Sequence, residues 1–520
     1  MLGKLLRSRQ SFFVFLVGVT FLWVLVLYGV REDVHRYSST IVQPPPERTR
    51  QQYERKSPSA PADSGSQHIA IFQNAPGISE AKKFRAGQNE RTHLSLQVIG
   101  DPDIRRVRVL VLSWHGGTMK DTVMQLHAAG VRHENIVCEG AVWYEQVLDS
   151  APCVRDGLLA KALNPLMQSV PGFPNEIDTD ETWLTNFTYK ATDWLGRFDV
   201  LWADFPAVLC LLLHNIAPNK LIVRTTHRFD HQVAHVETNS TSFIRKKLLH
   251  VLRNAPILLA GSEYDWAYIR YYTCREPERL FITWPTQYFE SLGAPYTLTN
   301  ESAFILWGGS NEQGSRSISI TFDRIRELAS KQKSYLPIKS RPKKFRHASE
   351  FATEQAAVYF PYSMPSSAFH ELYASGVPLF VPSLAFMLRE FSKHRGYPHK
   401  VAGNSACGAP SFYENAEFAS FCCLRGTDDS EVCHDPNSCD PEALRQWVPL
   451  GDIYTTPHLT YFDSAEHAVE LMKHWMQNPN HRYEVIEAMA QYNVANIRQN
   501  TAVVQAAIRH IRHVSLSQTP

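Results

Sequence analysis

The stretch that most constrains the fold of this 520-residue chain is residues 356–382, which read AAVYFPYSMPSSAFHELYASGVPLFVP. Residues 356–360 are a short apolar run rich in Val, Tyr and Phe, which is typical of a buried strand. A second such run follows at 379–381. The helix predicted between them starts near Ser366 and ends at Gly376, where a left-handed C-cap is wanted. This spacing of strand, helix and strand predicts a βαβ unit whose two strands are parallel.

The start of the predicted helix is where a parallel sheet of this kind binds ligands. Ligands lie beyond the carboxyl ends of the strands and against helix N-termini. We therefore expect Ser366, Ser367 and the first-turn amides to face a crevice, with Glu371 about one turn further in. A βαβ unit without a ligand is the other interpretation, because acidic residues are favoured near helix starts in any case.

The run HELYASGVPLFVP resembles the donor-nucleotide segment of glycosyltransferases with the GT-B fold. In those enzymes a Glu, followed by a small residue, Gly, one residue and Pro, closes on the ribose of a nucleotide sugar. Glu371, Gly376 and Pro378 match this pattern. The resemblance implies an α/β fold with two Rossmann-like domains facing a cleft. Many retaining members carry a second Glu eight positions earlier, where this chain has Ser363, so the stereochemical class stays open.

The N-terminus is predicted to anchor the chain in a membrane. Residues 12–30, from Phe12 to Val30, are apolar enough and long enough to cross a bilayer. Residues 1–11 are basic and are expected to form a cytoplasmic tail. A cleaved signal peptide is the alternative, but no small-x-small site follows the apolar run. Residues 31–103 are predicted to form a stem, which begins Pro-rich and poor in apolar residues.

Other features agree with a lumenal location, and we expect a single-pass type II protein of the Golgi membrane. Sequons start at Asn186, Asn239 and Asn300. Five of the nine cysteines fall in 403–440, which predicts a disulfide-stapled insertion in an oxidising compartment. A zinc site near Cys433 and Cys439 is the alternative, although paired CxxC spacing is missing. The odd cysteine count leaves a thiol unpaired, and Cys210, inside an apolar run, is the expected one.

The rest of the chain is predicted to hold two Rossmann-like domains. Residues 104–292 form the expected acceptor domain, and residues 300–464 the expected donor domain. The resemblance implies that helices in 465–520 pack back across both. Strands of the first domain are expected at 107–112, 198–203, 221–223 and 256–260, and the second domain opens with a strand at 304–307. Polar residues follow four strands of the first domain, where a site should be.

His115 is the first catalytic candidate, because it lies just beyond the first strand of the acceptor domain. The resemblance implies a general base for the acceptor hydroxyl at this place, and an imidazole titrates near neutral pH. A His that merely caps or packs the loop is the alternative. Gly116 and Gly117 resemble a loop that lets amides approach the donor diphosphate, although a plain turn would look the same.

His227 and Arg228 follow another predicted strand and are expected to point into the cleft, His227 as a second catalytic candidate. Arg228 could bind phosphate or an acidic acceptor. His227, His231 and His235 could instead share a helix face and hold a metal, but GT-B enzymes need none.

In the donor domain, Ser366, Ser367 and Glu371 are the expected donor contacts. Gly308, Gly309 and Arg316 join them, because they follow the first strand of that half, where the family places diphosphate contacts.

We therefore expect a glycosyltransferase that moves a sugar from a UDP- or GDP-sugar to a glycan or glycoprotein hydroxyl, without a cofactor. A net charge of +2 without a basic face argues against nucleic-acid binding. One alternative is a metal-dependent GT-A enzyme, which would use Asp178 and Asp180 of a DxD sequence. Another is a non-catalytic lumenal binding protein on an α/β scaffold.

Overall fold

The computed structural model divides the chain into two compact units, Met1–Arg91 and Thr92–Pro520, and every described residue belongs to the second. The described residues are 102–113, 115–140, 153–154, 191–226, 229, 239–273, 280–285, 298–299, 302–308, 316–332, 336–341, 348–361, 364, 366–393, 434–436, 438 and 440–517. The predicted membrane span, the stem and most of the Cys-rich insertion lie outside them. None of the helices in the described ranges is both long and apolar enough to cross a membrane.

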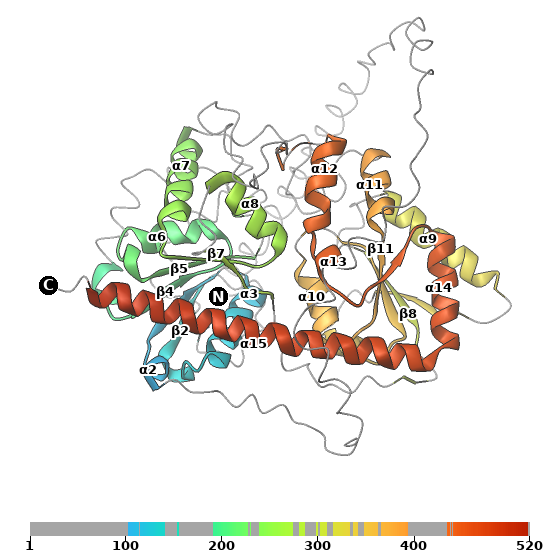
Figure 1. Ribbon diagram of the computed structural model, residues 1–520, viewed down its shortest axis with the longest axis horizontal. Coiled ribbons are helices and arrows are strands. Elements are labelled where there is room, and N and C mark those ends of the chain that lie inside the picture. Colours follow the sequence, from blue (N-terminus) through green and yellow to red (C-terminus); the bar gives the residue numbers. More distant parts are fainter. Residues whose placement is uncertain are drawn as a thin grey trace, which may run out of the picture. The chain divides into compact units, whose positions relative to one another are not determined.

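The first half of Thr92–Pro520 contains a seven-stranded sheet with the order β3-β2-β1-β4-β5-β6-β7, in which every pairing is parallel (Figure 1). The strands are β1 (Val109–Leu112), β2 (Ile136–Glu139), β3 (Cys153–Val154), β4 (Val200–Ala203), β5 (Leu221–Thr225), β6 (Ile257–Ala260) and β7 (Leu280–Ile282). Its helices are α2 (Pro102–Arg105), α3 (Gly116–Ala128), α6 (Cys210–His214), α7 (Asn239–Asn254) and α8 (Glu263–Thr273), with short 3-10 turns at His133–Asn135, Ala207–Leu209 and Pro218–Lys220.

Successive side chains of these strands point to opposite faces of the sheet, and both faces are buried, as is usual for a parallel sheet. On one face Val109, Val111 and Trp202 pack with residues of α3 and of the C-terminal helix α15 (Pro479–Ser517). On the other face Leu110 and Leu201 pack with α6, α7 and α8. The burial pattern of the four residues of β1 is continuous, which explains why the apolar run predicted a buried strand.

The second half contains a five-stranded parallel sheet with the order β12-β11-β10-β8-β9. Its strands are β8 (Phe304–Trp307), β9 (Ile338–Ser340), β10 (Ala356–Tyr359), β11 (Leu379–Pro382) and β12 (Thr460–Phe462). Its helices are α9 (Arg316–Ser330), α10 (Ser367–Ala374), α11 (Leu384–Lys393), α12 (Pro441–Trp447), α13 (Asp452–Thr455) and α14 (Ala465–Gln477), with 3-10 turns at Ala348–Phe351 and Val448–Leu450.

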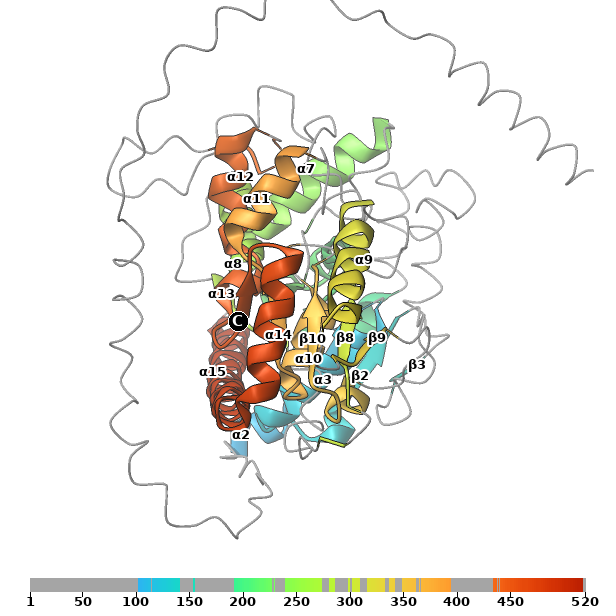
Figure 2. The ribbon, with the colours of Figure 1, turned by 90° about the vertical axis from the view of Figure 1, so that its right-hand side faces the viewer.

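The second sheet is also covered on both faces. Phe304, Leu306 and Val358 face the side where α9 and α14 pack together (Figure 2). Trp307 and Tyr359 face the side of α10 and the first part of α15. The helix α10 therefore lies against the sheet at the point where β10 ends.

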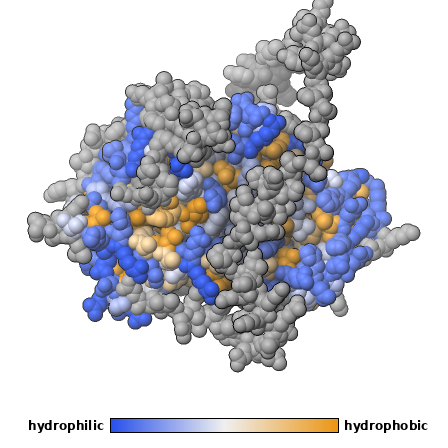
Figure 3. Space-filling model, viewed as in Figure 1, coloured by the Kyte–Doolittle hydropathy of each residue, from blue (hydrophilic) through white to orange (hydrophobic). Residues whose placement is uncertain are grey.

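The longest helix, α15, has 39 residues and contacts elements of both halves. Its first part contacts α10 and α14, and its later part contacts α2, α3, β4 and β5 (Figure 1). In the same view the described surface is mostly hydrophilic, with apolar residues showing near its middle (Figure 3). Both sheets are thus connected by a continuous helix as well as by the chain between β7 and β8.

The βαβ unit predicted from residues 356–382 is confirmed. Strands β10 and β11 are parallel, with Ala357 opposite Leu379. The helix between them ends at Ala374, and Gly376, two residues further on, has a φ of 74°, the left-handed conformation expected there. Cys210 is a free, buried thiol, as its position in an apolar run predicted.

Candidate functional site

The start of α10 is held by a carboxylate from another helix. Ser366 is the N-cap residue, but its side chain makes no capping hydrogen bond and instead pairs with the Tyr359 hydroxyl. The Ser366 backbone N–H donates to Asp452 Oδ2, on α13, at 2.6 Å. Both residues are almost fully buried. Ser366, one of the two serines that could cap this helix, is therefore the N-cap residue by position, but its hydroxyl is taken by Tyr359 rather than by a first-turn amide.

The same carboxylate lies beside the first turn of α10. His370 Nε2 is 3.0 Å from Asp452 Oδ2, and both side chains are more than nine-tenths buried. The angle at this contact does not fit a hydrogen bond, since Nε2 has no hydrogen-bond partner among the described residues. The contact is thus a close approach of the two groups rather than an aligned hydrogen bond.

Glu371, the proposed ribose ligand, follows His370 on α10 and is 9% exposed. We expected this side chain to lie in an open crevice, but it is largely buried. The Ser375 backbone N–H and hydroxyl donate to the Glu371 carbonyl, which fixes the last turn of this short helix.

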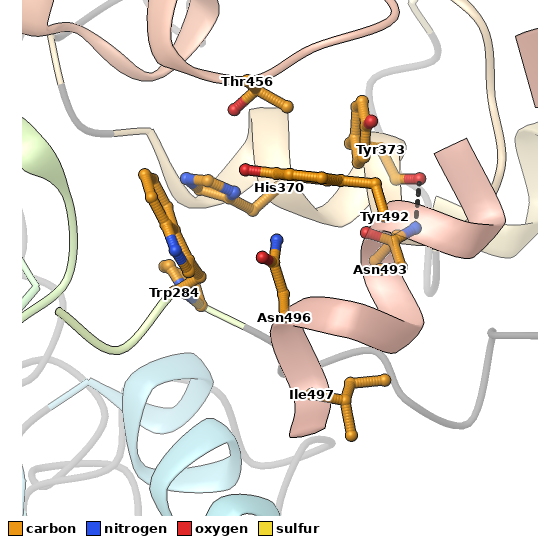
Figure 4. A pocket seen from close by; sticks show the side chains of 10 residues that line it. Trp284, His370, Tyr373, Thr456, Tyr492, Asn493, Asn496 and Ile497 are labelled. Carbon is orange, nitrogen blue, oxygen red and sulfur yellow. Dashed lines mark hydrogen bonds between the residues drawn. The ribbon is translucent and has the colours of Figure 1, made fainter. Parts of the chain in front are cut away.

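A small pocket, partly open to solvent, adjoins the His370 side of α10. Its lining residues come from the segment after β7, from α10, from the turn after α13 and from α15: Trp284, Pro285, His370, Tyr373, Ala374, Thr456, Tyr492, Asn493, Asn496 and Ile497. Figure 4 shows the Trp284, His370 and Tyr492 side chains converging on it from three elements. The Trp284 and His370 ring centroids are 6.2 Å apart.

Two tyrosines form part of the wall of this pocket. The Tyr373 hydroxyl donates to the Pro457 carbonyl at 3.1 Å, and burial raises the pKa of this phenol. Burial also raises the pKa of the Tyr492 phenol, an effect that the Asn496 side chain partly offsets. Both phenols therefore stay neutral at physiological pH, and the pocket offers aromatic faces, hydroxyls, carboxamides and the His370 imidazole.

A buried ionic network lies at the carboxyl ends of β4 and β5. Arg224 pairs with Asp121 of α3 and donates from Nη1 to Thr122 Oγ1 at 3.1 Å. The Thr122 hydroxyl donates to Asp204 Oδ2 at 2.7 Å. Arg224 and Asp204 are fully buried. Two carboxyl groups thus share one guanidinium, and desolvation raises the pKa of Asp204 from 3.8 to about 6 against the opposing effect of Arg224.

The network reaches the pocket through one glutamine. Gln125 Nε2 donates to Asp121 Oδ2 at 3.1 Å and to the Trp284 carbonyl at 3.3 Å. Arg224 and the pocket residue Trp284 are therefore joined through polar contacts inside the molecule.

His115 is the N-cap of α3, and its Nδ1 accepts from the Thr118 N–H at 3.4 Å. A neutral imidazole that accepts at Nδ1 carries its proton on Nε2. Gly116 and Gly117 are the first, buried residues of the helix. The first-turn amides of α3 lack intrahelical acceptors, so this helix start can also attract an anion.

The structure describes the remaining predicted site residues only in part. A Cβ on Gly308 would lie 3.1 Å from Phe322 and 3.3 Å from Ile318 of α9, so close packing of helix on strand accounts for this glycine. Arg316 and Ser367 are the first residues of α9 and α10, and their side chains lie outside the described part.

His227, Arg228 and Gly309 lie outside the described residues altogether, as do Asp178, Asp180, His231 and His235. Their predicted roles stay predictions. Within the described ranges there is no group of three or more His, Cys, Asp or Glu side chains that could hold a metal ion.

Sequence reasoning missed His370, Asp452 and Arg224. A signal was available for Arg224: it stands in LIVRT, which we ended at Val223 but which is a strand to Thr225. An Arg inside a buried strand requires a carboxylate partner. No comparable signal marks Asp452, because nothing local in the sequence brings α13 to the start of α10.

Comparisons with known proteins find similarity at the level of solved structures. No protein-family model and no curated protein sequence matches the chain. A structure described as the glycotransferase of kitacinnamycin is similar with a TM-score of 0.37, 10% identity and coverage of 78% of this chain and 99% of that one.

Two further structures give similar values. Arabidopsis thaliana UGT89C1 complexed with quercetin has a TM-score of 0.35, 11% identity and coverage of 77% and 99%. Anabaena Alr3699/HepE in complex with UDP has a TM-score of 0.34, 10% identity and coverage of 79% and 100%. Similarity this distant carries no argument about activity. The chain's own architecture, two parallel sheets each covered by helices, fits the GT-B fold.

Proposed function

We propose that the protein is a glycosyltransferase that moves a sugar from a UDP- or GDP-sugar to the hydroxyl of a glycan or glycoprotein. One observation carries the proposal. Glu371 lies on α10, the helix that follows β10, the middle strand of the five-stranded parallel sheet, and Gly376 and Pro378 lie between this helix and β11. This is where an open α/β sheet binds a nucleotide. The two-sheet architecture does not favour the GT-A alternative.

In this proposal the residues have separate roles. Glu371 accepts hydrogen bonds from the ribose hydroxyls, and the first-turn amides of α10 stabilise the departing diphosphate. Gly309, Arg228 and Arg316 are further diphosphate contacts, and His227 faces the acceptor. His115 is the general base for the acceptor hydroxyl, which requires a ring nitrogen with a free lone pair, so Nδ1 must leave the Thr118 amide and either act as the base itself or take the proton from Nε2.

We also propose a single-pass type II location in the Golgi membrane, with residues 12–30 as the anchor. The sequence supports this with the apolar run and the sequons. Cys138 is disulfide-bonded, and such bonds persist in oxidising compartments. Resistance of the full chain to carbonate extraction, together with glycans at the sequons, is the expected result. An unglycosylated cytosolic chain would contradict it.

The test of the activity is a titration of the purified protein with a panel of nucleotide sugars, with and without a chelator. The account predicts binding of a UDP- or GDP-sugar and release of UDP or GDP in the presence of an acceptor, both unaffected by the chelator. Release abolished by the chelator would instead support a metal-dependent enzyme. The absence of any binding would support a non-catalytic binding protein.

A further inference from the structure

Asp452 places a buried negative charge at the helix start that the proposed function assigns to the donor diphosphate. Its Oδ2 accepts from the Ser366 N–H at 2.6 Å, and the residue is 1% exposed. A helix start attracts anions because its first amides have no acceptor in the helix and the helix dipole is positive there. The chain therefore already supplies an anion at the place where a diphosphate would bind.

The pairing of this carboxylate is incomplete. Asp452 Oδ1 is buried and forms no hydrogen bond within the described residues, and the same is true of His370 Nε2. Nε2 nevertheless lies 3.0 Å from Oδ2. The pair carries a net charge of −1 with a neutral imidazole and of 0 with a protonated one, so a proton on His370 cancels the charge of the carboxylate.

Other titratable groups lie on the neighbouring elements. Tyr373 on α10 and Tyr492 on α15 line the pocket with His370, Glu371 follows His370 in the chain, and Glu263 at the start of α8 acts on Tyr492. The two phenols stay neutral because burial raises their pKa. Among these side chains, the His370 imidazole is the basic one.

We propose that the His370–Asp452 pair couples donor binding to the uptake of a proton. A diphosphate bound at the first-turn amides of Ser367 and Ala368 brings further negative charge next to Asp452. The diphosphate and the Asp452 carboxylate are both negative and repel each other, and protonation of His370 offsets this repulsion. The inference rests on the proposed function, since it needs the diphosphate at the start of α10.

The consequence is a donor affinity that rises as the pH falls. The bound state holds one more proton than the free state, so the affinity changes by up to about tenfold for each pH unit. Removal of the Asp452 charge makes the affinity higher and independent of pH, because both the repulsion and the reason for proton uptake are gone. Removal of the His370 imidazole leaves the affinity low and independent of pH.

The test is isothermal titration calorimetry of the full chain with UDP-glucose and with GDP-mannose. The diphosphate of each is esterified at both ends and does not itself gain a proton in the range used, from about pH 6 to 8. Each titration is repeated in two buffers of different ionisation enthalpy, which gives the number of protons taken up. Wild type is expected to take up a proton and to bind about tenfold or more tightly at the lower pH.

Asp452→Asn keeps an oxygen that can accept from the Ser366 amide, and it is expected to bind more tightly than wild type at the higher pH, without proton uptake. His370→Gln is expected to lose proton uptake, and it tests the inference if Asp452→Asn fails to fold. The matched controls are Asp463→Asn and His467→Gln, from a second His–Asp pair whose atoms lie 3.5 Å apart and are exposed. Both controls are expected to keep the wild-type pH dependence.

The possible failures are distinguishable. If wild type binds a nucleotide sugar with an affinity that does not depend on pH, the inference is overturned and the proposed function stands. If proton uptake persists in His370→Gln, a different group takes the proton and the inference is also overturned. If neither nucleotide sugar binds at any pH, the proposed function fails and the inference with it.

Discussion

The carboxamide of Asn500 is hydrogen-bonded to both backbone groups of Trp284. Asn500 Oδ1 accepts from the Trp284 N–H at 3.1 Å, and Nδ2 donates to the Trp284 carbonyl at 2.8 Å. Asn500 is 1% exposed. The two residues are 216 positions apart, and the contact fixes the segment after β7 to α15. Since the Trp284 ring also lines the pocket with His370, this pair helps to set the pocket's wall.

We expect Asn500→Ala to lower the free energy of unfolding by about 1–3 kcal/mol, because it leaves the buried Trp284 N–H without its partner, while the Trp284 carbonyl keeps only the hydrogen bond from Gln125 Nε2. Chemical denaturation measures the change. Gln505→Ala is the control, since Gln505 Nε2 donates to one backbone carbonyl, at 3.0 Å, from a half-buried position on the same helix. Equal losses of unfolding free energy for the two substitutions would show that the Asn500–Trp284 contact contributes no more than an ordinary side-chain hydrogen bond.

Asp204 should make part of the stability depend on pH. Its pKa is raised from 3.8 to about 6 in the folded protein, mainly by desolvation. Between these pH values the folded state binds the proton and the unfolded state does not. The contribution is therefore fully present below about pH 4 and is lost as the pH rises through about 6.

The measurement is the free energy of unfolding of wild type and Asp204→Asn across this range. As the pH rises, the free energy of unfolding of wild type should fall by about 3 kcal/mol or less relative to that of the variant. This is the free energy that corresponds to a pKa difference of this size. Asp323→Asn, at an exposed position, should run parallel to wild type. A constant difference between Asp204→Asn and wild type would contradict the raised pKa.

His115 has two candidate roles that substitution separates. As the N-cap of α3 it contributes about 1 kcal/mol, which His115→Ala should remove and His115→Asn should largely keep. As a general base its imidazole is required, so both variants should lose turnover while they keep donor affinity. Melting temperature, nucleotide affinity and nucleotide release are measured for each. Normal turnover in His115→Asn would leave only the capping role.

The βαβ unit around Glu371 could be predicted because its signals are local. Residues 304–307 and 356–360 are apolar runs that do become buried strands, and Gly376 marks the end of α10 by its own conformational freedom. Short edge strands were missed. Strand β9 reads IKS and is largely exposed, so it lacks the burial pattern that identifies a strand.

The polar contacts of the candidate site could not be predicted, since they join residues distant in the chain. Arg224 meets Asp121 across 103 positions, and Ser366 meets Asp452 across 86. Such pairs depend on how the helices pack on the sheets, and a single sequence does not record this. Local sequence indicated a serine cap, and Ser366 is the N-cap residue, but its contacts with the Tyr359 hydroxyl and with Asp452 could not be read from it.

The measurement that tests the central claim most directly is the affinity of Glu371→Gln for a nucleotide sugar, taken together with its melting temperature. Glutamine keeps the shape of this buried side chain and removes the charge that strengthens its hydrogen bonds to the ribose hydroxyls. We predict a loss of affinity of about tenfold or more with little change in melting temperature. Glu442→Gln is the control, at an exposed first-turn position of α12, and should bind as wild type does. Wild-type affinity in Glu371→Gln would contradict the assignment of α10 as the donor-binding helix.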